Sequence, residues 1–331
     1  MVESDRSGAM NLDDLLARAT DRVVVNPSDG KSGAHFEKLT VDGQRYFLKV
    51  LSYDADWIMR CSGNTDFWEY KVWHAGLYDR VPAEIDHTIV AMSLEAGRLS
   101  LLARDVSDYL IPEGDDLVTL EQADAFMDHM AAFHAAYWGW RDDVGLSSIE
   151  QRIGFFSDAN VAREMHAADP PGPIVVAQQG WSMLRDRSPA LADLVEPARA
   201  NPTPLADALR ALPVTFVAGD WKMGNLGYNA SAKQTIVLDW AYPGSCPGLW
   251  DLMWYLGVNR ARLPRSKEDT IASYRDALER RGIETAGWWN DAVGLCALAQ
   301  MCMMGWEKAV GDDDELRWWE DFVSRTGGRP A

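Results

Sequence analysis

Cysteine and basic residues are both scarce in this chain of 331 residues. No two of its four cysteines have C-x-x-C spacing: Cys61, Cys246, Cys296 and Cys302. Four scattered cysteines in a chain of this length do not make a disulfide framework, so they favour a reducing compartment. Lysine and arginine number 32 against 50 acidic residues, and the formal net charge is −18. A protein that wraps a nucleic acid needs a basic surface, so this composition argues against a nucleic-acid partner.

Long apolar runs and the pattern of a signal peptide are missing as well. The longest uncharged apolar run, from Val293 to Trp306, is too short to span a bilayer and predicts a buried helix. The first residues show no charged segment followed by an apolar one, which is the pattern of a signal peptide. We therefore expect a cytoplasmic protein with no membrane partner.

The first third of the chain is rich in strand signals. Asp42-Gly43 lies between two β-rich runs and predicts a hairpin turn. The elements expected here are a short helix after Asn11, three antiparallel strands within 22–51, a helix at 65–77 that carries Glu69, and strands at 88–93 and 99–103.

Helical patterns dominate after Val106. The elements expected here are a helix at 120–137, several helices within 146–210, short strands at 214–217 and 235–238, and helices to the end. A β-rich lobe followed by a helical one is an α+β arrangement and not an alternating, doubly wound sheet. The length also suits about two lobes, which we expect at residues 1–106 and 107–331.

The most informative stretch runs from Val217 to Trp240. Asp220 follows a short strand, Asn225 lies five residues later, and Asp239 ends the next strand. Two strands joined by a short loop would bring the three side chains to one edge. Amide and carboxylate oxygens suit Mg²⁺, and the remaining Asp could take a proton from a hydroxyl, as phosphoryl transfer requires. Alone, an Asp-x-x-x-x-Asn segment is more often a turn.

This stretch resembles the catalytic loop of the aminoglycoside phosphotransferase and choline kinase family, written H-G-D-x-x-x-x-N with a metal-binding Asp in a later D-W or D-F pair. Asp220 then corresponds to the catalytic base, and Lys222 to a lysine that contacts the transferring phosphate. Asn225 and Asp239 correspond to the ligands of Mg²⁺. The chain departs from the family at Ala218, where a histidine usually braces the loop.

Five other segments, in the family's order, extend the resemblance from residue 22 to about residue 257. Lys49 is similar to the lysine that holds the α- and β-phosphates, and Glu69 to the helix glutamate that pairs with it. The backbones of Arg104 and Val106 lie in a segment that resembles the hinge that reads the nucleotide base. The last two segments resemble the family's L-A-x-L-H helix and its D-P-x-x-D-L segment: 131–135 and 247–252.

Several of these residues have simpler interpretations. Lys31, in the loop Ser28–Gly33, is either a phosphate contact or a solvated charge, because the loop lacks G-x-G-x-x-G. Lys49 could be an edge-strand lysine. We interpret His134 as a helix-packing residue and Asp251 as a helix-start carboxylate that braces the catalytic loop.

The resemblance implies a bilobal protein-kinase-like fold with a small antiparallel β lobe, which binds nucleotide, and a larger helical lobe, which binds the acceptor. It implies an enzyme that transfers the γ-phosphate of ATP or GTP, with Mg²⁺, to a hydroxyl of a small molecule. An antibiotic of aminoglycoside, nucleoside or peptide type is our first expectation for the acceptor. The alternatives are a kinase of a sugar, choline or amino alcohol, a non-catalytic nucleotide-binding pseudokinase, and a transferase of AMP.

The acidic excess suggests a property of the acceptor. We predict that it carries an ammonium or another basic group and meets acidic side chains of the second lobe, such as those of Asp312 to Glu315. The simpler interpretation is that the charge serves only solubility.

Overall fold

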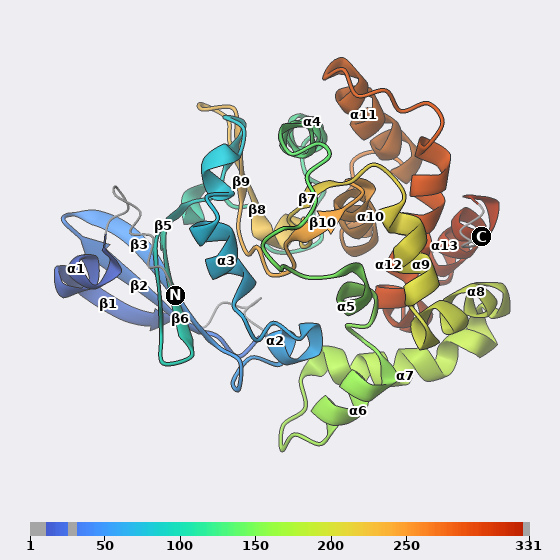
Figure 1. The fold of residues 1–331 in the computed structure, drawn as a ribbon, viewed down its shortest axis with the longest axis horizontal. Coiled ribbons are helices and arrows are strands. Elements are labelled where there is room, and N and C mark those ends of the chain that lie inside the picture. Colours follow the sequence, from blue (N-terminus) through green and yellow to red (C-terminus); the bar gives the residue numbers. More distant parts are fainter. Residues whose placement is uncertain (1–10, 26–31, 327–331) are drawn as a thin grey trace.

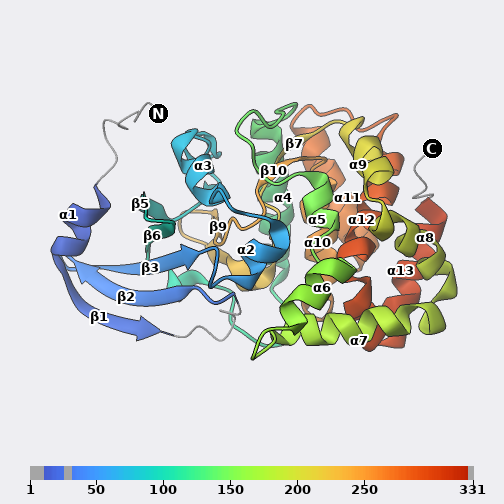
Figure 2. The same cartoon turned by 60° about the horizontal axis from the view of Figure 1, so that its bottom comes forward.

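The structure is a computed structural model that describes residues 11–25 and 32–326. Figures 1 and 2 show a curved sheet at one end of the molecule, a packed group of helices at the other, and small strands between them. This is the α+β arrangement with an antiparallel β lobe and a mainly helical lobe that the resemblance implied.

The first 109 residues contain all five strands of the large sheet. In chain order the elements are α1 Leu12–Ala17, β1 Ala19–Val25, β2 His35–Val41, β3 Gln44–Ser52, α2 Trp57–Ser62, α3 Trp68–His74, the 3-10 turn η1 Tyr78–Arg80, β4 Ile85–Asp86, β5 Ile89–Glu95, β6 Arg98–Arg104 and η2 Ser107–Tyr109. Asn11 caps α1 as expected, because its side chain accepts the N–H groups of Asp13 and Asp14. The hairpin at Asp42-Gly43 is confirmed as well.

The large sheet has the order β1-β2-β3-β6-β5, with every neighbouring pair antiparallel. Lys49 lies in the central strand β3, where it pairs with Phe36 on one side and Leu101 on the other. The interpretation of Lys49 as an edge-strand lysine is therefore wrong.

The helix predicted at 65–77 begins later than expected, at Trp68. Phe67 has a left-handed φ of 54°, and the Asn64 side chain accepts the N–H of Trp68 at 2.9 Å. A separate helix, α2, precedes it and was not predicted. Its start and stop signals are local, since Asp56 caps its first turn and Gly63 ends it at a φ of 72°.

The second part of the chain is mainly helical. Its elements are α4 Leu120–Ala136, α5 Ile149–Ile153, α6 Asp158–Met165, α7 Gly172–Arg187, α8 Pro189–Ala200, α9 Thr203–Arg210, β7 Thr215–Val217, η3 Met223–Asn225, β8 Leu226–Asn229, β9 Gln234–Val237, β10 Gly244–Cys246, α10 Leu249–Val258, η4 Arg260–Arg262, α11 Lys267–Arg280, α12 Trp289–Val310 and α13 Asp313–Thr326. The apolar run Val293–Trp306 lies in α12 and is buried throughout, as predicted. Within residues 11–25 and 32–326, no helix is both long and apolar enough to cross a membrane.

The strands around the loop at 218–225 differ from the expectation of two strands joined directly. β7 pairs with β10, whereas β9 pairs with β8 and with β4. The loop therefore runs from one small sheet into another, because the unpredicted strand β8 begins directly after Asn225. β4 belongs to the first part of the chain and pairs in parallel with β9, so the two parts share a sheet.

Candidate active site

Gly219 shapes the loop that carries Asp220. It has a left-handed φ of 81°, and a Cβ at this position would lie 2.2 Å from the backbone oxygen of Tyr242. A side chain would therefore clash with backbone as well as strain the turn. The loop therefore lies close against the Tyr242 backbone, and Asp220, three residues after the end of β7, is 5% exposed.

Asp251 of α10 braces this loop, as the sequence predicted. Its two carboxylate oxygens accept the backbone N–H groups of Ala218 at 2.9 Å and Gly219 at 2.8 Å. His134 lies 3.2 Å from the same carboxylate, and its other ring nitrogen lies 2.6 Å from the Tyr274 hydroxyl. His134 and Asp251 are fully buried. Since the brace acts on the backbone, it does not need a histidine side chain at position 218.

Three side chains hold the carboxylate of Asp220. Asn225 donates its amide N–H to Oδ2 at 2.8 Å, and Lys222 lies 3.1 Å from the same oxygen. Trp254 donates its indole N–H to Oδ1 at 2.7 Å. Burial raises the pKa of Asp220, and the attraction of Lys222 and these hydrogen bonds only partly offset it. The structure thus brings the three residues of the predicted loop together.

Asp239 and Lys49 form the second half of the site. The Lys49 Nζ lies 2.6 Å from Oδ1 of Asp239, across 190 residues of sequence. Burial works to raise the pKa of Asp239, but the charge and hydrogen bond of Lys49 outweigh it and lower the pKa. Burial likewise works against the charge of Lys49, yet the neighbouring carboxylates raise its pKa. Both side chains are therefore charged near neutral pH.

Glu69 lies near Lys49 without taking the ion pair that the sequence predicted for it. Its side chain is buried, and its Oε2 accepts a hydrogen bond from Asn64 at 3.4 Å. Burial raises the pKa of Glu69 to about 7, although the charge of Lys49 acts in the opposite direction. The ion pair of Lys49 with Asp239 thus keeps that carboxylate ionised, whereas Glu69, without such a pair, has the higher pKa of the two.

The segment after β6 carries the residues predicted to read a nucleotide base. The Arg104 N–H donates to the Thr88 carbonyl at 3.0 Å, and the Val106 carbonyl accepts the N–H of Tyr109 at 2.9 Å. Contacts of the Arg104 and Val106 backbones with a nucleotide base stay a prediction. The Arg104 guanidinium pairs with Asp86. Lys31 lies outside the described residues.

Sequence reasoning missed Trp254. It lies three residues after Asp251 on α10, so it shares a helix face with the carboxylate that braces the loop. The motif containing Asp251 together with helical spacing could have found it.

The oxygens near Asp220 suit a divalent cation. Asn225 gives its amide N–H to Asp220, so that hydrogen bond does not use its amide oxygen, and Asp239 supplies an ionised carboxylate. In the part of the chain that the structure describes, no three His, Cys, Asp or Glu side chains gather as a metal cage. Two protein ligands are nevertheless what Mg²⁺ needs, because it keeps waters and binds substrate phosphates. The donor set therefore fits the cation that the resemblance implied.

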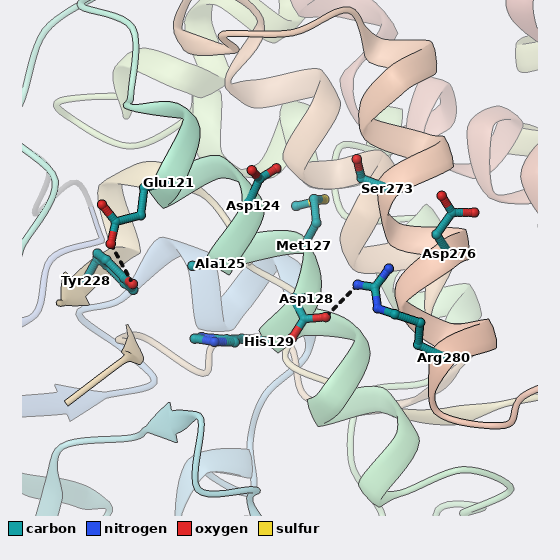
Figure 3. Close-up of a pocket in the computed structure, with 10 residues that line it drawn as sticks. All are labelled: Glu121, Asp124, Ala125, Met127, Asp128, His129, Tyr228, Ser273, Asp276 and Arg280. Atoms are coloured by element: carbon teal, nitrogen blue, oxygen red, sulfur yellow. Dashed lines mark hydrogen bonds and ion pairs between the residues drawn. The ribbon is translucent and has the colours of Figure 1, made fainter. Parts of the chain in front are cut away.

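A cavity of about 500 Å³ lies elsewhere, between α4 and α11 (Figure 3). Two of its four acidic residues are paired with arginines: Asp124 with Arg265, and Asp128 with Arg280 and Arg281. No predicted site residue among those described lines this cavity. We therefore do not assign the predicted chemistry to it.

The Asp312–Glu315 cluster does not offer free carboxylates for an acceptor. Each member has a basic partner, namely Arg260 for Asp312, Arg187 for Asp313, Arg317 for Asp314 and Lys267 for Glu315. Figures 1 and 2 also place α13 at the end of the molecule away from the large sheet. The cluster caps and pins α13, so the expectation that it contacts the acceptor finds no support here.

Comparison with solved structures identifies the fold. A spectinomycin phosphotransferase in complex with ADP and spectinomycin matches with a TM-score of 0.51 at 12% identity, over 92% of this chain and 88% of that one. Choline kinase LicA from Streptococcus pneumoniae matches with a TM-score of 0.50 at 11% identity, over 94% of each chain. The chain has the fold of these small-molecule phosphotransferases. No family model matches the sequence, and no curated protein does.

Proposed function

We propose that the protein transfers the γ-phosphate of ATP or GTP to a hydroxyl of a small molecule. The observation that carries the proposal is the convergence of Asp220, Asn225 and Asp239, from one stretch of 20 residues, with Lys49 of the distant strand β3. A shared fold alone does not imply shared chemistry, because one fold hosts many activities. The four side chains add the chemistry: a carboxylate held by hydrogen bonds, two oxygen ligands for a metal ion, and the ammonium group of a lysine.

Each residue has a distinct role in this proposal. Asp220 orients the acceptor hydroxyl and takes its proton, and its buried carboxylate, held by three donors, is suited to that task. When nucleotide binds, Lys49 exchanges its ion pair with Asp239 for a contact with the nucleotide phosphates. Lys222 stabilises the negative charge that develops on the transferred group. Asn225 and Asp239 would hold Mg²⁺, which when bound neutralises charge on the phosphates.

The remaining contacts belong to the nucleotide and the acceptor. Glu69 steadies Lys49 electrostatically, and the backbones of Arg104 and Val106 would bind the base in the linker between residues 1–106 and 107–331. Lys31, which precedes β2 in the sequence, would contact the phosphates. For the acceptor we favour an antibiotic, since one neighbour of the same fold binds spectinomycin, and next a choline-like alcohol, since another is a choline kinase.

A product assay tests the proposal. The protein is incubated with Mg²⁺ and ATP or GTP against a panel of aminoglycosides, nucleoside antibiotics, sugars and amino alcohols, and products are identified by mass spectrometry. We expect a phosphate on one acceptor class. Asp220→Asn, which preserves shape, should lower turnover by about 10²–10⁴-fold with little change in nucleotide affinity.

The matched control is Asp193→Asn, which removes an exposed carboxylate of α8 that pairs with Arg185 of α7. It should turn over like the wild type. A nucleotidyl group on the acceptor would replace the proposal with AMP transfer. Nucleotide binding without any product across the panel would replace it with a non-catalytic binding protein.

A further inference from the structure

Trp254 contacts the carboxylate of Asp220 through its indole ring. Its N–H donates to Oδ1 at 2.7 Å, and its ring is partly exposed. α10 therefore contacts the loop twice, through Asp251 at the backbone and through Trp254 at the reacting side chain. A helix that also holds the loop is a rigid support for this second contact.

The hydrogen bonds to Asp220 are unevenly shared between its two oxygens. A carboxylate oxygen has two lone pairs in the carboxylate plane. On Oδ2 both are engaged, by Asn225 and Lys222. On Oδ1 one is engaged, by Trp254, so within the described part of the chain the remaining lone pair is on Oδ1.

We propose that Trp254 is a positioning residue that fixes the Asp220 carboxylate so that Oδ1, beside the indole, receives the acceptor's proton. The inference rests on the proposed function and deepens it. In the step, the acceptor O–H bond breaks and its proton goes to Oδ1. The acceptor oxygen uses an electron pair to form the new P–O bond, and the old P–O bond breaks with its pair on the leaving nucleoside diphosphate. Without the indole N–H, the carboxylate is free to rotate about its bond to Cβ.

Substitutions at position 254 separate the N–H from the ring. Trp254→Phe removes the donor, and 3-benzothienylalanine at position 254 replaces the N–H with sulfur while keeping the bicyclic shape. A hydrogen bond to a charged group corresponds to about a 10–100-fold effect, so we expect both variants to lose kcat by about tenfold or more. The KM for nucleotide should stay within about twofold, because Trp254 contacts the carboxylate of Asp220 and is assigned no contact with the nucleotide.

Trp318 is the matched control. Its indole N–H donates to Glu268 at 2.9 Å, which is the same kind of contact, on α13 far from the site. Trp318→Phe should leave kcat unchanged. Wild-type kcat in the benzothienylalanine protein, or a change confined to KM, would overturn the proposal. Since that variant keeps the shape of the side chain, a folding failure of Trp254→Phe does not protect the idea.

Indole N–H resonances give a second readout that needs no acceptor. The Trp254 signal, assigned by its loss in Trp254→Phe, should move in Asp220→Ala because its charged acceptor is gone, while the Trp318 signal stays. An unmoved Trp254 signal would overturn the contact. Absence of any product with the wild type would instead overturn the proposed function, and the resonance would then still decide whether Trp254 holds Asp220.

Discussion

Asp239 shows how one residue of the site depends on its partner. Its ionisation is maintained by Lys49 against the effect of burial. We predict that Asp239→Asn raises the Mg²⁺ concentration needed for nucleotide binding by at least about tenfold and lowers turnover, because a charge that holds the cation is lost. Isothermal titration with Mg²⁺ at fixed nucleotide measures this, with Asp193→Asn as the unaffected control. Superimposable curves for Asp239→Asn and the wild type would remove Asp239 from the metal site.

Glu69 gives a pH prediction. Its ordinary pKa of 4.5 rises to about 7 in the folded protein, chiefly through burial. Folding therefore holds a proton on Glu69, and its contribution to stability is fully present below about pH 4.5 and is lost as pH rises to about 7. Relative to Glu69→Gln, the wild type should lose up to about 3 kcal/mol of unfolding free energy over this interval. Urea unfolding of both proteins at pH 5 and pH 7.5 tests it, and parallel changes would contradict the assignment.

Residue identities in the loop were readable from the sequence, but their partners were less so. Asp220 and Asn225 are five residues apart, so a local motif indicates both. Lys49 was expected to pair with Glu69, and its hydrogen bond goes instead to Asp239, whereas Glu69 is buried beside it and accepts from Asn64. A contact across 190 residues is a property of the assembled fold, and spacing along the chain does not report it.

At the scale of elements, α2 links the two parts of the chain. Arg60 forms a bidentate pair with Glu164 of α6 at 3.0 and 2.6 Å, and Asn160 of α6 donates to the Cys61 carbonyl at 2.8 Å. Glu164 is 3% exposed. Arg163 also donates to Glu164, at 3.0 Å. We predict that Arg60→Met destabilises the protein by about 1.5–3 kcal/mol, because the buried carboxylate loses two charge-assisted hydrogen bonds and keeps Arg163 as a partner.

The double variant Arg60→Met/Glu164→Gln supplies the control for this ion pair. It removes both charges, so it should recover a large part of the lost stability. Thermal unfolding of the single and double variants measures the difference. Equal melting temperatures for the wild type and Arg60→Met would show that α2 is not anchored through this pair.

Elements with local signals were predicted better than those defined by distant pairing. The hairpin at Asp42-Gly43 and the helix α4 carry their turn and capping residues within a few positions. β8 and β10 are four and three residues long, and each exists because a strand elsewhere in the chain pairs with it. Such short strands lack a pattern of their own, so the two small sheets around Asp220 were not foreseen.

At the scale of the whole molecule, the charge of −18 acts as a diffuse field. The Asp312–Glu315 cluster is neutralised by its own basic partners, so attraction for a cationic acceptor would come from the acidic surface as a whole. Salt screens such a field over about 10 Å at 0.1 M.

We therefore predict that the KM of a cationic acceptor rises with ionic strength more than the KM of the anionic nucleotide does. Screening weakens the attraction of the acidic surface for the acceptor, and it also weakens the repulsion of the nucleotide. Steady-state kinetics between about 20 and 500 mM salt, over which the Debye length falls from roughly 20 Å to roughly 4 Å, measures both constants. Asp313→Asn/Asp314→Asn should behave like the wild type, because these two carboxylates are paired on α13. A salt-independent acceptor KM would leave the acidity as a property of solubility alone. A large loss in the double variant would return the acceptor to the cluster that the structure pairs internally.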